Sequence, residues 1–223
     1  MSFRSVVTVF VVMGVLGECS LALSADGQSP PNASAVKIEK IAMMPFFKGI
    51  SGHNATEMLD SPASGFYFDQ ENISIDAAQI LTRQVQEVLI DHHGTGIVSL
   101  KESTEVYDKL REKETRETPR VLAQRLGKQL KVGHVMIGTV WRYRDRIGGS
   151  YGVERPASVA FAVYLIDVSN GNLLWTENFE ETQRSLSENL LTMPTFLKRR
   201  GQWLSARELA EYGIDGIFSR YPF

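Results

Sequence analysis

Two strand-like segments joined by an Asn-Gly turn constrain the fold of this chain more than any other feature. Residues Ala157–Val168 (ASVAFAVYLIDV) form an apolar, β-branched run that is typical of a central strand. Ser169–Asn172 (SNGN) places Asn-Gly at the centre of a tight turn, and Leu173–Thr182 is long enough to return beside the first segment. We therefore predict a long β-hairpin, which needs a larger sheet around it to bury both faces.

The rest of the chain supplies candidate strands and helices for that sheet. Further strands are predicted at Lys40–Phe46, Gly96–Leu100 and His134–Arg146. Helices are predicted from Ser74 to His93, from Ser103, from Thr118-Pro119 to Gly133, and at 187–191 and 205–220. The predicted fold class is therefore α/β: a mixed sheet of about five strands with helices packed on it, in the order β-α-β-α-α-β-β-β-α. An antiparallel meander forms its C-terminal half.

The amino terminus has the pattern of an export signal. Arg4 precedes Val6–Leu16, an uncharged run that is too short to span a bilayer but fits the apolar region of a signal peptide. The only cysteine, Cys19, follows directly, and Leu16-Gly17-Glu18-Cys19 resembles a lipobox, in which the cysteine is acylated. Glu18 departs from that pattern, where Gly or Ala is usual. We predict a signal peptide over 1–18 and a lipidated Cys19.

Residues 19–35 are small and polar and contain Pro30-Pro31, which predicts a flexible tether before a single periplasmic α/β domain over 36–223. Ser20 after the cysteine favours the periplasmic face of the outer membrane as the location. The alternative is ordinary cleavage after Ser24 or Ala25, which would release a soluble periplasmic protein.

Composition excludes some classes of function. The formal net charge is −2, with 24 basic and 26 acidic residues, so the chain lacks the positive charge with which a nucleic-acid-binding protein neutralises phosphates. A single cysteine cannot form an internal disulfide. Apart from Asp91-His92-His93, which is considered below, no pattern predicts a metal or another cofactor.

Three segments together resemble a known superfamily. They are Ile41-Ala-Met-Met-Pro-Phe46, Val135-Met-Ile-Gly-Thr-Val140 and the run from Val163 to Trp175, in which Asp167 ends a strand, Gly171 lies in the hairpin and Trp175 opens the next strand. This combination is similar to the CsgG, TolB amino-terminal and LpoB superfamily of bacterial envelope proteins, over roughly Val36 to Thr182.

The resemblance implies a function by binding. Members include secretion-channel subunits, activators of penicillin-binding proteins and polysaccharide-secretion lipoproteins of the PelC type, and none of these roles is catalytic. It implies a non-enzymatic binding or assembly component in secretion, polysaccharide export or cell-wall machinery. The expected partners are envelope proteins or polysaccharide and a membrane reached through the lipid anchor, and some relatives form homo-oligomers.

Two groups of residues are candidates for partner binding. Alternation along a strand would place Arg142, Arg144 and Arg146 on one face, with Trp141 and Tyr143 on the other. That row would suit an acidic protein or a polysaccharide, or it would be a solvent-facing edge whose charges deter aggregation. Phe66, Tyr67 and Phe68 lie in a polar loop and would either anchor a partner or close the domain's own core.

Asp91-His92-His93 supports an alternative function, a soluble periplasmic metal-dependent hydrolase. The triplet matches a motif of metal-binding phosphoesterases. However, it stands at the end of a predicted helix and not after a strand, and a metal site needs several convergent ligands that the sequence does not supply elsewhere. The other interpretation is a polar helix end, where a histidine interacts favourably with the helix dipole.

Overall fold

The structure is a computed structural model that describes residues 40–49, 55–60, 73–113, 117–149, 152–183 and 203–223. In chain order the elements are β1 (Ile41–Met43), β2 (Phe47–Lys48), α1 (Ala55–Asp60), α2 (Ala77–His93), the 3-10 turn η2 (Gly94–Gly96), α3 (Leu100–Lys113), α4 (Pro119–Leu130), β3 (His134–Arg144), β4 (Ile147–Gly148), β5 (Val153–Arg155), β6 (Ser158–Asp167), β7 (Leu173–Thr182) and α6 (Ala206–Phe218).

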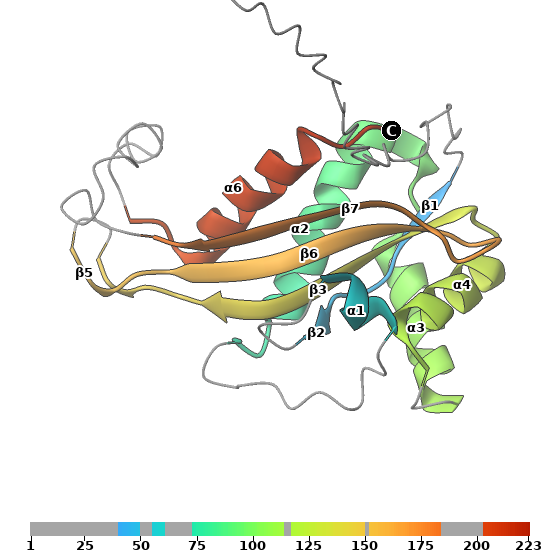
Figure 1. The fold of residues 1–223 in the computed structure, drawn as a ribbon, viewed down its shortest axis with the longest axis horizontal. Coiled ribbons are helices and arrows are strands. Elements are labelled where there is room, and N and C mark those ends of the chain that lie inside the picture. The colour runs from blue at the N-terminus through green and yellow to red at the C-terminus, as the bar shows by residue number, and fades with distance from the viewer. Residues whose placement is uncertain (1–39, 50–54, 61–72, 114–116, 150–151, 184–202) are drawn as a thin grey trace, which may run out of the picture. The chain divides into compact units, whose positions relative to one another are not determined.

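A mixed five-stranded sheet organises these elements, as the sequence predicts (Figure 1). β3, β6 and β7 form the antiparallel meander, and β1 and β2 both pair in parallel with β3. The predicted strand Lys40–Phe46 is shorter in the structure, where β1 covers Ile41–Met43 and β2 follows the predicted segment at Phe47–Lys48. Pro45, between them, has no N–H to contribute to the ladder. The next amide, that of Phe46, instead donates to Thr82 Oγ1 at 2.8 Å.

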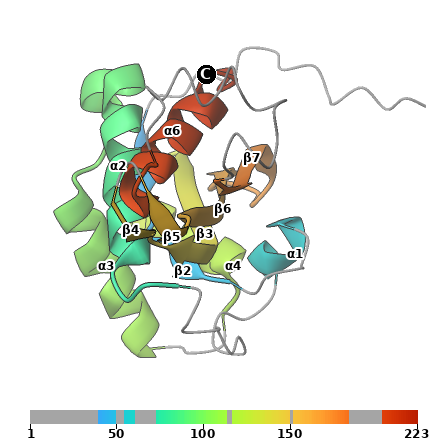
Figure 2. The same ribbon diagram turned by 90° about the vertical axis from the view of Figure 1, so that its left-hand side faces the viewer.

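Helices cover both faces of the sheet, so that the strands are buried between two apolar clusters. α2 and α6 pack on one face, which we call the α2–α6 face, through residues such as Leu81 and Leu209. α1, α3 and α4 pack on the opposite face, which we call the α3–α4 face, through residues such as Leu126. Figure 2 shows α2 and α6 together on one side of β3 and β6.

The hairpin forms as its turn residues predict. Asp167 Oδ1 accepts hydrogen bonds from the Ser169 amide (2.8 Å) and hydroxyl (2.6 Å), and Gly171 adopts a positive φ of 75° that favours glycine. Burial raises the pKa of Asp167, but the hydrogen bonds from Ser169 outweigh it and hold that pKa below its usual value. β6 and β7 then run side by side from this turn.

One predicted strand is wrong. Only Ile97 of Gly96–Leu100 forms a bridge, with Ile41, and α3 begins at Leu100. Ser99 explains the early helix, because its hydroxyl accepts a hydrogen bond from the Glu102 amide at 3.3 Å and so satisfies a free N–H of the first turn.

Candidate binding surface

A β-bulge at Trp141 rearranges the predicted row of arginines. The register of β3 against β6 shifts between Val140 and Arg142, so that Arg142 lies opposite Ala160 and Arg144 opposite Ser158. Ala162, which follows Ala160 on the same face of β6, belongs to the apolar cluster of the α3–α4 face, so Arg142 and Arg144 share that face.

The bulge also separates the two aromatic neighbours, which the sequence placed together. Trp141 packs against the cluster of the α3–α4 face, whereas Tyr143 is buried in the cluster of the α2–α6 face. Trp141 therefore lies on the same side of the sheet as Arg142 and Arg144, and a tryptophan beside two arginines is a combination common in binding hot spots.

Arg142 forms an ion pair across the neighbouring strand. Its Nη1 lies 2.9 Å from Glu180 Oε1 on β7, above the small side chain of Ala160. The Arg142 side chain is 20% exposed and that of Glu180 52%. The pair is therefore accessible from solvent on the Glu180 side, where a competing carboxylate can approach.

None of the described helices covers this end of the α3–α4 face. Figure 1 shows α1, α3 and α4 under the right-hand half of the sheet, whereas β3, β6 and β7 continue leftward toward β5. Along β7, Asn178 and Glu180 are exposed, and their partners in register place them on the same face. We call Trp141, Arg142, Arg144, Asn178 and Glu180 the strand-end surface.

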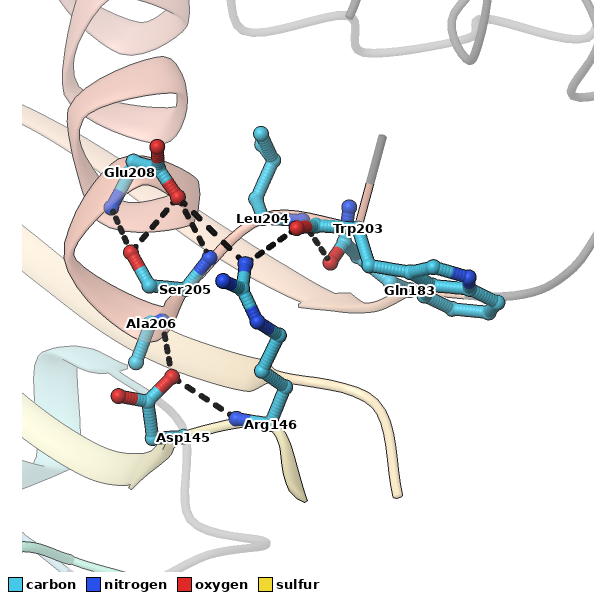
Figure 3. A network of polar contacts seen from close by, with 8 residues as sticks. All are labelled: Asp145, Arg146, Gln183, Trp203, Leu204, Ser205, Ala206 and Glu208. Atoms are coloured by element: carbon cyan, nitrogen blue, oxygen red, sulfur yellow. Dashed lines mark hydrogen bonds and ion pairs between the residues drawn. The ribbon is translucent and has the colours of Figure 1, made fainter. Parts of the chain in front are cut away.

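Arg146 does not belong to this surface, contrary to the predicted row of three. It lies beyond the end of β3 and turns to α6, where its guanidinium donates to the Trp203 carbonyl oxygen and lies 3.8 Å from Glu208 (Figure 3). Asp145 beside it accepts from the Ala206 amide at 2.9 Å. Both residues thus hold the start of α6 against the sheet.

The start of α6 is a complete capping box, and its Glu208 carboxylate is the charge that Arg146 approaches. Ser205 Oγ accepts from the Glu208 amide at 3.3 Å, and Glu208 Oε2 accepts from the Ser205 amide at 2.7 Å. These Ser205 hydrogen bonds lower the pKa of Glu208, so it stays ionised near Arg146. The role of Arg146 in the structure is therefore to position a helix.

Cys19 and Phe66-Tyr67-Phe68 lie outside the described residues. Their predicted roles, lipidation for the cysteine and partner contact for the aromatic loop, stay predictions.

Asp91-His92-His93 ends α2, and its histidines pack against the carboxyl-terminal residues. His93 Nε2 lies 3.1 Å from the Tyr221 hydroxyl, and the His92 ring lies 5.9 Å from Phe218 and 5.8 Å from Tyr221. Burial is the main cause that lowers the pKa of His93. Within the described ranges, no three His, Cys, Asp or Glu side chains are grouped to hold a metal.

The polar groove between α2 and α6 was not predicted from the sequence. Its lining includes Arg83 and Glu87 of α2, and Arg207 and Glu211 of α6. Each helix thus repeats an Arg and a Glu four residues apart, a spacing that places both side chains on one helix face. That repeat is visible in the sequence, but the meeting of the two helices is not.

Comparisons with known proteins give structural likeness only. No protein-family model matches the chain, and no curated protein matches it. Among solved structures, it is similar to the PelC dodecamer from Paraburkholderia phytofirmans, at 15% identity and a TM-score of 0.46, over 82% of this chain and 86% of that one. None of the described helices is long and apolar enough to cross a membrane.

Two further similar structures come from Salmonella enterica and Neisseria meningitidis. The LpoB C-terminal domain from Salmonella enterica is 14% identical, with a TM-score of 0.38, over 67% of this chain and 87% of that one. Lipoprotein GNA1162 from Neisseria meningitidis is 14% identical, with a TM-score of 0.40, over 73% and 95%. LpoB and PelC also figure in the resemblance drawn from the sequence, whereas its CsgG and TolB part stays a prediction.

Proposed function

We propose that this protein is an exported lipoprotein, anchored through Cys19 at the periplasmic face of the outer membrane. It acts there as a non-catalytic binding or assembly component of the envelope. The observation that carries the proposal is the strand-end surface, where Trp141, Arg142 and Arg144 occupy a part of the sheet that none of the described helices covers.

The chemistry of this surface suits a partner with acidic groups. The Arg142–Glu180 pair is partly exposed, and pairs of that kind contribute only about 0–1 kcal/mol, so a partner carboxylate can replace Glu180 at little cost. Arginine binds carboxylates and acidic sugars through planar, paired hydrogen bonds. Trp141 adds apolar area beside these charges. The partner is therefore an acidic patch on an envelope protein or an acidic polysaccharide.

Charge reversal tests the partner surface. In the double variant Arg142→Glu with Arg144→Glu, we expect at least a tenfold loss of the envelope component that co-purifies with the tagged protein, since both cations become repulsive. The matched control is Lys101→Glu with Lys109→Glu, which reverses two exposed charges on α3. Thermal unfolding of both variants verifies the fold. Unchanged capture by the arginine variant would show that this surface is not the interface.

A second experiment tests the anchor. Cys19→Ala removes the only thiol that can be acylated, and we expect the protein to move from the membrane fraction to the soluble periplasmic fraction. The intact mass of the wild-type protein should carry the added acyl chains. If membrane association is unchanged in Cys19→Ala, Cys19 is not the anchor. If the wild-type protein is itself soluble and carries no added acyl mass, cleavage after Ser24 or Ala25 becomes the better interpretation.

A further inference from the structure

Three of the chain's four histidines lie at one corner of the α2–α6 face. His92 and His93 end α2, whereas His134 begins β3, in a distant part of the sequence. His134 is 8% exposed, and both His92 and His134 act electrostatically on His93. The fourth, His53, lies outside the described residues. The corner therefore gathers side chains of the one type whose ordinary pKa lies between about pH 5 and 8.

Tyr221 joins this corner to Ser219–Phe223, the segment that follows α6. Its ring contacts side chains of α2, β7 and α6, with centroid distances of 5.5 Å to His93, 5.8 Å to His92, 5.0 Å to Trp175 and 5.3 Å to Phe218. Its hydroxyl lies 3.1 Å from His93 Nε2 and has no other hydrogen-bond partner among the described residues. The segment is thus attached to the end of α2 through a single side chain.

The hydrogen bond between His93 and Tyr221 depends on the protonation state of the histidine. A neutral imidazole has one nitrogen without a hydrogen, and in that form Nε2 accepts the hydrogen of the Tyr221 hydroxyl. Burial raises the pKa of Tyr221, so its hydroxyl stays a donor. A protonated His93 carries hydrogen on both nitrogens, so Tyr221, which is 9% exposed, loses its acceptor. Acid therefore weakens this contact.

The surroundings of His93 oppose its charged form. Burial is the main cause that lowers its pKa, followed by His92 and His134, each of which would add a positive charge in acid. Contact with Tyr221 is part of that burial, and release of the segment would expose the ring to water. The closed form is therefore favoured above about pH 6.5 and loses that advantage as the pH falls through its own lower pKa.

The carboxylates at this corner do not compensate a charge on His93. Asp167 of β6 acts on His134, and Asp91 of α2 is exposed, where water screens its charge. Glu177 of β7 binds Arg220 of the segment at 2.8 Å, in an exposed pair that holds the segment only weakly. None of the described carboxylates is among the causes that shift the pKa of His93.

We propose that the segment Ser219–Phe223 is a latch that acid opens. Protonation of His93 breaks its hydrogen bond with Tyr221, and the segment leaves the end of α2 while the sheet and α6 stay folded. Opening uncovers Trp175 of β7, which the Tyr221 ring covers in the closed form. The latch is independent of the strand-end surface, and either proposal can fail alone.

Amide ¹⁵N relaxation of the full chain in detergent tests the latch. At about pH 7.5 we expect order parameters of about 0.85 for Arg220 and Tyr221, and at about pH 5 we expect values below about 0.6. The ring protons of His93, followed over the same range, should titrate with the same midpoint as this loss of order. The amides of α6 and β7 should stay ordered throughout.

Two variants identify the trigger. His93→Gln is neutral at every pH, so we expect its segment to stay ordered in acid. His92→Gln is the matched control and should open as the wild type does, because the Phe218 ring, 5.9 Å from His92, stabilises a cation there.

Several outcomes would overturn the latch. One is a wild-type segment that stays ordered in acid, and another is a His93→Gln variant that opens as the wild type does. A third is loss of order in α6 together with the segment, which would be acid unfolding of the whole fold. If His93→Gln already loosens the segment at neutral pH, the wild-type midpoints decide, since different midpoints for His93 and the segment contradict the proposal.

Discussion

The two halves of the α3–α4 face are built from the same strands but differ in what covers them. In one half, the side chains of Val135, Ile137 and Tyr164 are fully buried in a cluster with Leu122 and Leu126 of α4. The other half is the strand-end surface, with half-buried arginines and an exposed Glu180. The same sheet face is thus core at one end and a partly exposed surface at the other.

The lengths of α4 and β3 differ, so α4 cannot cover the whole of β3. α4 has 12 residues and β3 has 11. At ~1.5 Å per helical residue and ~3.3 Å per strand residue, the helix spans about 18 Å and the strand about 36 Å. α4 alone can therefore cover only about half the length of β3.

The largest expected effect is on the free energy of unfolding, at the part of the α3–α4 face that α4 covers. A Cβ added at Gly127 of α4 would overlap Val168 and press on Val135 of β3, whereas a Cβ added at Gly216 of α6 would meet nothing. We expect Gly127→Ala to lower the free energy of unfolding by about 1–3 kcal/mol, despite the better helix propensity of alanine. Gly216→Ala should raise it by about 0.5–1 kcal/mol. Urea denaturation measures both, and equal effects would mean that α4 does not pack closely here.

The next effect concerns the strand-end surface. Trp141→Ala removes the large apolar side chain of the strand-end surface, and we expect at least a tenfold loss of the co-purified envelope partner. Because Trp141 is only half-buried, the unfolding midpoint should fall much less than for a core aromatic residue. Tyr212→Ala, an exposed aromatic residue on α6, is the control. Equal capture by both variants would remove Trp141 from the interface.

A smaller effect on partner capture is expected from the Arg142–Glu180 ion pair. Glu180→Gln removes the internal partner of Arg142, which then becomes available to a partner's acidic group. We expect partner capture to rise two- to threefold, which corresponds to about 0.5 kcal/mol and agrees with a surface pair. Reduced capture would show that Glu180 itself contacts the partner.

The smallest effect is a pH dependence on the opposite, α2–α6 side. Burial holds the pKa of His93 below the roughly 6.5 of the unfolded chain, so its neutral form is favoured in the fold. Its contribution to stability is present above about pH 6.5 and is lost as the pH falls through the lower pKa of the folded state. We expect the unfolding midpoint to drop between about pH 7.5 and 5 in the wild type, and less in His93→Gln. His92→Gln should retain most of the drop.

Local signals predicted much of this fold. The Asn-Gly turn defined the β6–β7 hairpin, and β7 has the predicted bounds, Leu173–Thr182. The Thr118-Pro119 pair marked the start of α4, where the Thr118 hydroxyl accepts from the Val121 amide at 3.4 Å. Each of these features depends on residues within a few positions of one another, which a sequence displays directly.

The parts that could not be predicted depend on distant residues. Alternation along β3 assumes a regular strand, and the bulge at Trp141 is formed only against β6. Alternation also places Arg146 in the arginine row. The contacts that instead turn it to α6 are with Trp203 and Glu208, about sixty residues further along the chain, and the sequence does not display them. The α2–α6 groove needs two helices more than a hundred residues apart to meet at Gln84.

Site-specific photo-crosslinking in intact cells tests most directly whether the strand-end surface binds a partner. A photoreactive residue is placed at Asn178 of that surface and, in a second strain, at Lys101 of α3; both positions are exposed. We expect a crosslink to an envelope component from position 178 alone, and we expect Arg142→Glu with Arg144→Glu to abolish it. No crosslink from position 178, or the same product from both positions, would contradict it.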